Sequence, residues 1–260
     1  MCGIAGFFYA DRHQTVDRSV LHRMAESIAH RGPDAEGIWT DPGIGLAHRR
    51  LSIIDLDGGD QPIGNEDDSI QVVFNGEIYN YQTLRADLKL RGHRFRTRSD
   101  TEVLVHLYEE YGERLVEKLR GMFAFAVYDR PRRLVLLVRD RIGLKPLYYS
   151  RDAGKLVFGS EIKAILQYPE ISREIDVEAL EDYLAFGFIP GERTIFQSIR
   201  KLAPGHHLLI GPETMAASPK RYWQLNVELD DHLSLDDWQD RLRSKLKETI
   251  AIRRSCPGRI

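Results

Sequence analysis

The chain opens with Met1-Cys2-Gly3-Ile4-Ala5-Gly6-Phe7-Phe8, a stretch that indicates both a buried strand and a chemistry. Removal of Met1 would leave Cys2 with a thiol and a free α-amine on one residue. Such an amine titrates near pH ~8, close to an unperturbed thiol, so it can accept a proton near neutrality. Cys2 is therefore a candidate nucleophile that carries its own base, although a lone cysteine is more often a small buried apolar residue.

The composition of the 260 residues limits the remaining classes of protein. Hydrophobic residues make up 42% of the chain, which is enough for a substantial core, and the net charge of −2 offers no basic surface for nucleic acid. Two cysteines at opposite ends give no disulfide framework and suit a reducing compartment. No apolar run approaches the ~20 residues of a membrane span. We expect a cytoplasmic protein that binds neither nucleic acid nor membrane.

Hydrophobic patterning predicts strands and helices that alternate along the chain. Strands are predicted at 2–9, 44–54, 70–74, 77–79, 122–128, 134–138, 147–149, 156–158 and 206–210, and helices at 16–28, 84–90, 100–111, 160–166, 176–186 and 234–252. Short links between strands indicate antiparallel sheets. Two packed sheets with helices outside satisfy the whole pattern.

Asn75 and Gly76 lie between two apolar runs and have two interpretations. The side-chain amide of Asn75 and the backbone N–H of Gly76 are adjacent donors, which suit an oxyanion formed when Cys2 attacks a carbonyl. The same dipeptide is also the best short signal for a hairpin turn, with Glu77–Tyr79 as the return strand. The two are compatible, since a tight turn would present both donors rigidly.

Two charged residues suit the ends of an amino acid. Arg49 and Arg50 lie in a predicted strand, whose alternation directs them to opposite faces, so only one can face a site and bind a carboxylate. Asp100 follows Ser99 at a predicted helix start, where Ser99 and Glu102 form a candidate capping box. Asp100 would either cap this helix or pair with an ammonium group. No His, Cys or carboxylate cluster has the spacing of a metal site, so no metal is expected.

Six segments together resemble, in the same order, those of class II glutamine amidotransferases. They are Met1–Gly6, His30–Asp34, Arg50–Asp55, Asn75–Asn80, Ser99–Glu102 and Gly121–Ala126. The segment Arg50–Asp55 is similar to that of glutamine-hydrolysing asparagine synthetases. The resemblance implies the fold of an N-terminal-nucleophile (Ntn) hydrolase in the α+β class. This fold is an αββα sandwich of two mainly antiparallel sheets with helices on both outer faces.

The resemblance also implies a reaction. Cys2 attacks the side-chain amide of L-glutamine, its α-amine shuttles the proton, and Asn75 and Gly76 hold the oxyanion. Ammonia leaves for a second domain, where ATP-dependent amidation converts aspartate to asparagine. The glutaminase step itself needs no cofactor.

The resemblance further implies that Arg50 binds the α-carboxylate of glutamine and that Asp100 binds its α-ammonium, with Glu77 assisting. Two alternatives stay open. One is an amidotransferase that uses a different carboxylate acceptor, and the other is a non-catalytic interaction module that keeps the fold.

The chain is expected to have three parts: a glutaminase domain at 1–210, a linker at 211–233 and the truncated start of a synthetase domain at 234–260. The Ser-Gly-Gly-x-Asp-Ser loop of that second domain does not occur, so ATP and Mg²⁺ are expected only with the missing part. Residues 235–250 carry an apolar stripe of five residues spaced three or four apart. We expect this stripe to pack on the first domain, to pair with a second copy in a homo-oligomer, or to fray.

Overall fold

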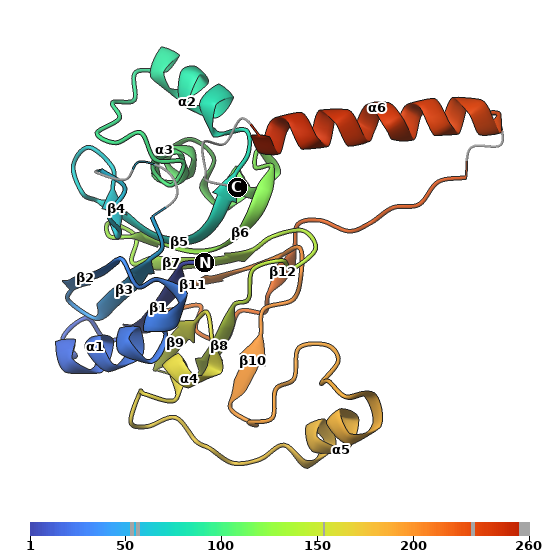
Figure 1. Ribbon diagram of the computed structural model, residues 1–260. Helices are drawn as coiled ribbons and strands as arrows, with labels where there is room; N and C mark the ends of the chain where they lie inside the picture. Colours follow the sequence, from blue (N-terminus) through green and yellow to red (C-terminus); the bar gives the residue numbers. More distant parts are fainter. Residues whose placement is uncertain (53–54, 56–57, 153, 230–231, 255–260) are drawn as a thin grey trace.

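Strand β1 (Gly3–Tyr9) begins directly after Cys2 and is buried along its whole length inside a six-stranded sheet. The computed structural model describes residues 1–52, 55, 58–152, 154–229 and 232–254, which form two such sheets (Figure 1). The first sheet has the order β10-β8-β9-β1-β3-β2, with antiparallel pairings throughout. Its other strands are β2 (Ala35–Asp41), β3 (Ile44–Arg50), β8 (Tyr148–Arg151), β9 (Lys155–Gly159) and β10 (Ile199–Lys201).

The second sheet has the order β12-β11-β7-β6-β5-β4 and is also antiparallel. Strands β5 (Ile70–Ile78) and β6 (Gly121–Asp129) pair along their full length. The other strands are β4 (Ile63–Gly64), β7 (Leu134–Arg139), β11 (His206–Ile210) and β12 (Lys220–Arg221). The antiparallel pairing of β6 with β7 across a short link confirms the antiparallel sheets that such links predicted.

The side chains of β1 alternate between two hydrophobic layers. Ile4 and Phe8 face the second sheet, whereas Ala5 and Phe7 face the helices α1 (Arg18–Ser27) and α4 (Ile162–Ile165). Complete burial of Phe7 and Phe8 stabilises the fold by roughly 1.5–3 kcal/mol for each ring.

A third apolar layer lies between the second sheet and the helices α2 (Tyr81–Leu90) and α3 (Glu102–Tyr111). Short 3-10 helices follow α1 at Ala29–Arg31 (η1) and α3 at Gly112–Glu117 (η2). Three apolar layers thus join four layers of secondary structure, with helices on both outer faces (Figure 1). The predicted αββα sandwich is confirmed.

The hairpin predicted at Asn75-Gly76 is wrong. Asn75 pairs with Ala124 and Gly76 with Phe123, so β5 runs through both residues without a turn. The partner strand β6 is remote in sequence, and its pairing overrides the local turn preference. Gly76 is required here by close packing, because a Cβ at this position would lie 2.1 Å from the carbonyl oxygen of Met122.

The capping box predicted at Ser99 and Glu102 is also wrong, because α3 begins at Glu102 itself and its N-cap residue makes no side-chain cap. The Glu102 carboxylate instead accepts hydrogen bonds from the backbone N–H groups of Arg96 (2.6 Å) and Thr97 (2.7 Å). It therefore joins the start of α3 to the loop before it. The predicted end of this helix at residue 111 is confirmed, since Gly112 caps α3 with a φ of 55°.

The first part of the chain extends beyond the boundary predicted at residue 210. Strand β12 pairs with β11, and Met215 is buried in the layer between the sheets. The hydroxyl of Tyr222 donates to the carbonyl of Arg139 at 2.6 Å. Contacts with the sandwich therefore continue to Tyr222, within the segment expected to be a linker.

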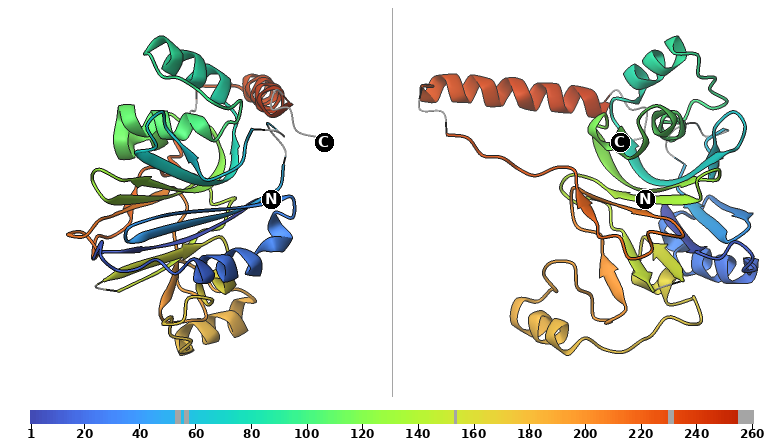
Figure 2. Two further views of the ribbon diagram at one scale, coloured as in Figure 1. Left: turned by 90° about the vertical axis from the view of Figure 1, so that its left-hand side faces the viewer. Right: turned by 180° about the vertical axis from the view of Figure 1, so that it is seen from behind.

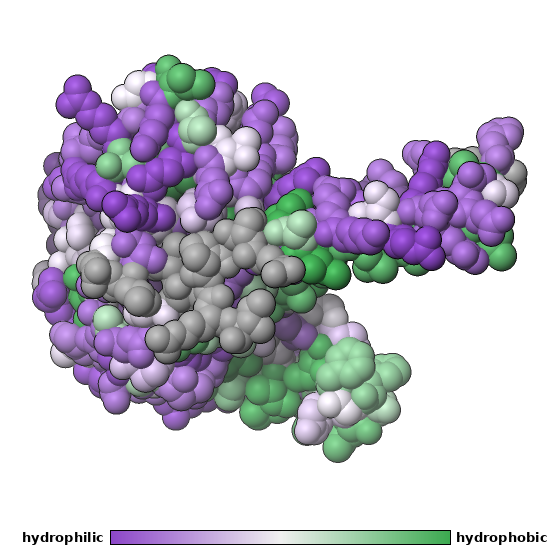
Figure 3. All heavy atoms as spheres, turned by 45° about the horizontal axis from the view of Figure 1, so that its top comes forward, coloured by the Kyte–Doolittle hydropathy of each residue, from purple (hydrophilic) through white to green (hydrophobic). Residues whose placement is uncertain are grey.

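Helices α5 (Val177–Phe186) and α6 (Leu235–Arg254) each carry several exposed apolar side chains. Helix α5 has Leu184 and Phe186 on the surface, where green atoms gather beside the sandwich (Figure 3). The N-terminal end of helix α6 projects away from the two sheets in Figure 1 and in the right-hand view of Figure 2, while its C-terminal half reaches the sandwich, where Arg120 Nη1 lies 3.5 Å from Glu248 Oε1. Its predicted stripe is exposed, from 45% at Trp238 to 73% at Leu235. Among the described residues, no helix is long and apolar enough to cross a membrane.

Strand β3 ends at Arg50, so the strand predicted for 44–54 is shorter than expected. Ile53 and Ile54, which belonged to that prediction, lie outside the described residues. The shortening places Arg50 at a strand end, next to the segment that approaches Cys2.

Candidate active site

A pocket of about 170 Å³ lies beside the start of β1, the end of β3 and the last third of β5. Its lining includes every site residue predicted from the sequence, namely Cys2, Arg50, Asn75, Gly76, Glu77 and Asp100. Strand ends and the start of α3 thus bring together four segments that are far apart in the chain.

The thiol of Cys2 lies against the backbone of Leu51. The N–H of Leu51 donates to Sγ at 3.4 Å, and Sγ donates to the carbonyl of Leu51 at 3.6 Å. Burial raises the pKa of the thiol, while the Leu51 N–H, the chain's α-amine and Arg50 oppose this rise. A thiol held neutral needs an adjacent base before it can act as a nucleophile.

The α-amine of the chain is a suitable base. Burial lowers the pKa of the Met1 α-amine, and the positive charges of Arg31 and Lys145 lower it further. A neutral amine can accept a proton, whereas an ammonium group cannot. Removal of Met1 would place a free α-amine on Cys2 itself, which is the base that the sequence predicts.

Arg31 positions the backbone of Cys2, a role that the sequence did not reveal. Its Nε donates to the carbonyl of Cys2 at 2.9 Å, and its Nη1 donates to Glu161 Oε1 at 3.0 Å. Arg31 ends η1, within the segment 30–34 that is one of the six segments carrying the resemblance. The resemblance thus included Arg31, but nothing in the sequence of this segment indicated a contact with Cys2.

Asn75 presents an unsatisfied donor. The residue is 1% exposed, and its Nδ2 is a buried atom for which no hydrogen-bond partner is found among the described residues. A buried donor without a partner costs roughly 1–3 kcal/mol. Because Asn75 lines the pocket, its amide is available to an oxygen atom of a ligand there.

Strand alternation directs the N–H of Gly76 to the same pocket. The N–H of Phe74 points away from β6 to Gln61 Oε1 at 2.6 Å, and the N–H of Ile78 points away from β6 to Asp100 Oδ2 at 2.9 Å. Gly76 lies midway between them, so its N–H shares their direction. The edge of β5 therefore offers a backbone donor beside the Asn75 amide.

The two arginines of β3 face opposite directions, as predicted. Arg49 points to the outer layer, where it forms ion pairs with Glu26 and Glu36, each at 2.9 Å. Arg50 is 6% exposed and lines the pocket. Arg50, which the resemblance implied, is thus the arginine on the pocket side of the strand.

Arg50 is already engaged in ion pairing. Its Nη1 lies 2.8 Å from Asp60 Oδ1, and its Nη2 donates to the carbonyl of Asp55. The side chain of Asp60 is 74% exposed. A substrate carboxylate would therefore share the guanidinium with Asp60, or displace this exposed carboxylate into solvent.

Asp100 is a buried carboxylate with an unusual pKa. Burial raises its pKa to about 6, and the negative charge of Glu77 adds to the rise, against the hydrogen bond from the Ile78 N–H. An ionised Asp100 therefore lacks a compensating cation in the described residues around it. An ammonium group bound in the pocket would supply that cation.

Glu77 and Lys145 lie on the remaining wall of the pocket. Burial lowers the pKa of Lys145, and the nearby Glu77 opposes this shift. The Lys145 Nζ lies 3.2 Å from the sulfur of Met1, a contact that removal of Met1 would release. Lys145 was not predicted, because it lies in the loop between β7 and β8, outside all six segments.

Two buried polar side chains support the segment that carries Asn75. His48 Nε2 lies 3.1 Å from the carbonyl of Phe74, and burial lowers the pKa of His48 to about 3, so the neutral ring donates this bond. Gln61 accepts from the N–H of Phe74 and donates to Thr101 Oγ1 at 3.3 Å. These bonds fix the backbone one residue before the Asn75 amide.

The two-sheet sandwich, with a cysteine at the start of a central strand, defines the class of Ntn hydrolases. Residues 1–223 match the family described as "Glutamine amidotransferase domain", and the chain belongs to this family.

Curated relatives with similar sequences are asparagine synthetases. The chain is 42% identical over 254 residues to "Asparagine synthetase [glutamine-hydrolyzing] 1" of Bacillus subtilis (strain 168), and 37% identical over 255 residues to "Asparagine synthetase [glutamine-hydrolyzing] 3" of the same organism. Each alignment covers 96% of this chain but only 39% and 41% of the relative. The chain is thus homologous to the N-terminal, glutamine-hydrolysing half of these enzymes.

A solved structure supports the fold. The glutamine phosphoribosylpyrophosphate amidotransferase of B. subtilis superposes with a TM-score of 0.60 at 20% identity, over 87% of this chain and 50% of that chain. This likeness concerns the fold alone.

Proposed function

We propose that this chain hydrolyses the side-chain amide of L-glutamine, with the thiol of Cys2 as the nucleophile once Met1 has been removed. The observation that carries the proposal is the buried Nδ2 of Asn75, which has no partner among the described residues and lies in the pocket that contains Cys2. A donor left unpaired in this way suits an oxygen whose negative charge develops only during the reaction.

The reaction has two balanced steps. Sγ of Cys2 attacks the amide carbon of glutamine, and the α-amine of Cys2 takes the thiol proton. The amide oxygen becomes an oxyanion that accepts hydrogen bonds from Asn75 Nδ2 and the N–H of Gly76. Collapse of this intermediate breaks the C–N bond, and the ammonium group of Cys2 returns the proton to the leaving ammonia. Water then hydrolyses the thioester to glutamate, and the same groups act in reverse.

The charged residues of the pocket select the amino acid. We assign the α-carboxylate of glutamine to Arg50 and its α-ammonium to Asp100, with Glu77 adding negative charge beside the ammonium. The raised pKa of Asp100 supports this assignment, because an ammonium group would stabilise a carboxylate that is otherwise buried without a cation. No cofactor takes part in these steps.

The fate of the ammonia belongs to the whole protein. The asparagine synthetase names of the similar relatives support aspartate as the acceptor rather than another carboxylate. We propose that ATP and Mg²⁺ act in a synthetase domain that residues 234–260 would begin. We also place the reaction in the cytoplasm, where the thiol of Cys2 stays reduced.

An electrophilic glutamine analogue tests the nucleophile. A diazoketone analogue should alkylate Sγ of Cys2 with one label per chain, and L-glutamine should protect against labelling. Peptide mapping locates the label. A label on another residue, or an absence of protection by L-glutamine, would show that the pocket is a binding site without this nucleophile.

A further inference from the structure

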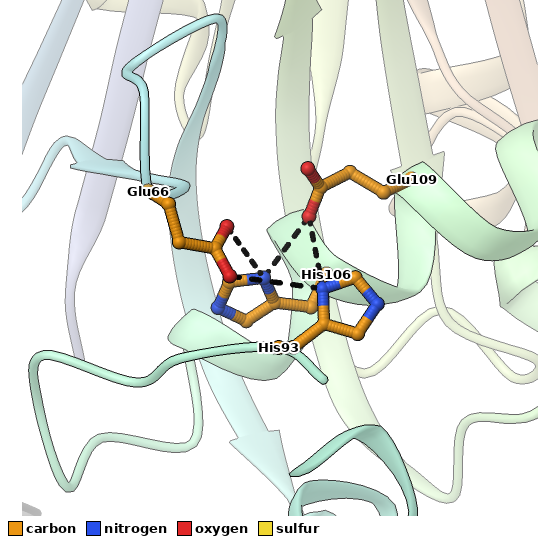
Figure 4. Close-up of side chains that lie close together, drawn as sticks. All are labelled: Glu66, His93, His106 and Glu109. Atoms are coloured by element: carbon orange, nitrogen blue, oxygen red, sulfur yellow. Dashed lines mark hydrogen bonds and ion pairs between the residues drawn. The ribbon is translucent and has the colours of Figure 1, made fainter. Parts of the chain in front are cut away.

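Four side chains converge on one point beside α3, on the helical side of the second sheet (Figure 4). Glu66 comes from the loop between β4 and β5, His93 from the loop between α2 and α3, and His106 and Glu109 from α3 itself. One ligand atom from each residue lies within 4.8 Å of all the others. The sequence spacing gave no sign of this cluster, because three separate segments contribute to it.

The spacing of these atoms approaches that of a tetrahedral metal site. His106 Nδ1 lies 3.0 Å from Glu109 Oε2 and 3.5 Å from Glu66 Oε2. His93 Nδ1 lies 3.4 Å from Glu109 Oε2 and 3.9 Å from Glu66 Oε1. Bond lengths of 2.0–2.2 Å to zinc place neighbouring ligand atoms about 3.3–3.6 Å apart.

Both histidines have a carboxylate at the ring nitrogen that faces away from the centre. His93 Nε2 lies 3.1 Å from Glu110 Oε1, and His106 Nε2 lies 3.8 Å from Glu102 Oε1. The hydrogen bond to Glu110 holds the proton of His93 on Nε2 and leaves the lone pair on Nδ1, whereas His106 Nε2 is buried without a hydrogen-bond partner among the described residues. Both Nδ1 atoms point to the centre of the cluster.

The two central carboxylates are oriented in the same manner. Asn65 Nδ2 donates to Glu109 Oε1 at 2.9 Å, and the backbone N–H of Arg94 donates to Glu66 Oε1 at 2.8 Å. These bonds occupy one oxygen of each carboxylate. The Oε2 atom of each then faces His106 Nδ1.

We propose that Glu66, His93, His106 and Glu109 bind one divalent transition-metal ion of the Zn²⁺ class. Two neutral imidazoles and two carboxylates balance the charge of such an ion, and nitrogen ligands favour zinc over calcium or magnesium. Four ligands from the protein close the coordination shell, as in structural rather than catalytic zinc sites. His106 is completely buried, so solvent reaches the centre only from the side of the other three residues.

Such an ion would stabilise the segment that carries Asp100. It would join the loop before α3 to the helix and to the loop after β4. Glu102, which lies behind His106, also holds the N–H groups of Arg96 and Thr97 in that loop. The ion would therefore fix the chain that runs from His93 to Asp100, at a distance from the proposed nucleophile.

The test is Zn²⁺ binding by the whole chain after removal of metal with a chelator. A Cys2→Ala/Cys256→Ser background removes both thiols, so that neither binds the ion and the result does not depend on the glutaminase reaction. Calorimetry should give one Zn²⁺ per chain. Zinc at one hundred times its Kd should raise Tm by about 5–10 °C. Co²⁺ in the same site should give the visible absorption of a tetrahedral ion.

Variants of His93 and Glu109 keep the test interpretable, because these two ligands border solvent and their replacement disturbs the core less than that of His106. Their side chains are 13% (His93) and 28% (Glu109) exposed. Glu110→Gln, which removes the carboxylate behind His93, should weaken Zn²⁺ binding by about 10–100-fold. His93→Ala and Glu109→Gln, which each remove a ligand, should weaken it more. His30→Gln is the matched control, because His30 also lies 2.9 Å from a glutamate, Glu161, and should leave the Kd unchanged.

An alternative without metal makes an opposite prediction. Burial disfavours the charged form of His106, yet Glu102, Glu109 and Glu66 together raise its pKa to about 9, so the cluster can exist as ion pairs around an imidazolium. The absence of Zn²⁺ binding in the folded parent would establish that alternative. Binding that persists within about threefold in both His93→Ala and Glu109→Gln, with circular dichroism unchanged, would also overturn the proposed site.

Discussion

Replacement of Asp100 by Asn should stabilise the protein at neutral pH while it removes glutamine binding. The buried carboxylate has a pKa of about 6, against 3.8 for the ordinary side chain. A raised pKa means that the folded state prefers the protonated form. The stabilisation that protonated Asp100 contributes is complete below pH 3.8, the pKa of this side chain in the unfolded chain, and it is lost as pH rises through about 6.

The magnitude follows from the pKa difference. About two units at 1.36 kcal/mol each give a cost of roughly 3 kcal/mol for the ionised carboxylate above pH ~7. Asn has nearly the shape of the protonated acid, and its oxygen can keep the bond from the Ile78 N–H. Asp100→Asn should therefore raise the free energy of unfolding by up to about 3 kcal/mol at pH 8, and by nearly nothing at pH 4.

Urea denaturation of both proteins across this pH range measures the effect. Asp240→Asn is the control, because the Asp240 side chain is 79% exposed on α6, and it should change stability by less than about 0.5 kcal/mol. L-Glutamine should stabilise the wild type but not Asp100→Asn. A variant that is equally or less stable than the wild type at pH 8 would refute the view that Asp100 is a buried, uncompensated anion.

Four further results are expected. Asn75→Ala should lower kcat for glutamine by about 10²–10³ with little change in KM, because its amide binds charge that develops in the transition state; steady-state kinetics with an unchanged kcat would reassign it to ground-state binding. Arg50→Lys should raise KM for glutamine through loss of the two-pronged guanidinium, whereas Arg49→Ala should have much less effect; the reverse order would contradict the strand-face assignment. The ratio kcat/KM should fall as pH drops through about 6, since protonated Asp100 cannot pair with an ammonium, and a profile that is flat from pH 5 to 8 would argue against this pairing. Deletion of residues 231–260 should leave glutaminase activity intact and reduce self-association in sedimentation, because the stripe on α6 is exposed; loss of activity would show that α6 belongs to the first domain.

The sandwich was predictable because its signals are local. The period-2 alternation of Ile4, Ala5, Phe7 and Phe8 recurs in the other central strands, and it determines which side chains face each apolar layer. The same alternation predicted that only one of Arg49 and Arg50 faces the pocket, and the resemblance selected Arg50, which lines it.

The failures concern contacts between remote segments. Asn75-Gly76 has the sequence of a turn, but pairing with β6 keeps it extended, so the donors lie at a strand edge instead of a hairpin tip. Glu102 has the position of a capping residue, but it bonds the preceding loop. Local propensity gives no information about either partner.

The supporting residues of the site were not predictable for the same reason. Arg31 reaches the carbonyl of Cys2, 29 positions away, and Gln61 joins β5 to the start of α3 through Phe74 and Thr101, which are 13 and 40 positions away. The cluster around His106 likewise forms only when three segments meet. Motif spacing identifies residues that act within one segment, whereas these act between segments.

The role of Cys2 as both nucleophile and base is tested most directly by glutamate release from L-glutamine without ATP. The protein for this assay begins at Cys2, as established by mass spectrometry. This species should turn over glutamine steadily. Cys2→Ala should show no turnover with an unchanged Tm, and protein that retains Met1 should show none because it lacks the free amine on Cys2. Equal turnover by the Met1-retaining protein, or by Cys2→Ala, would contradict the role of Cys2 as both nucleophile and base.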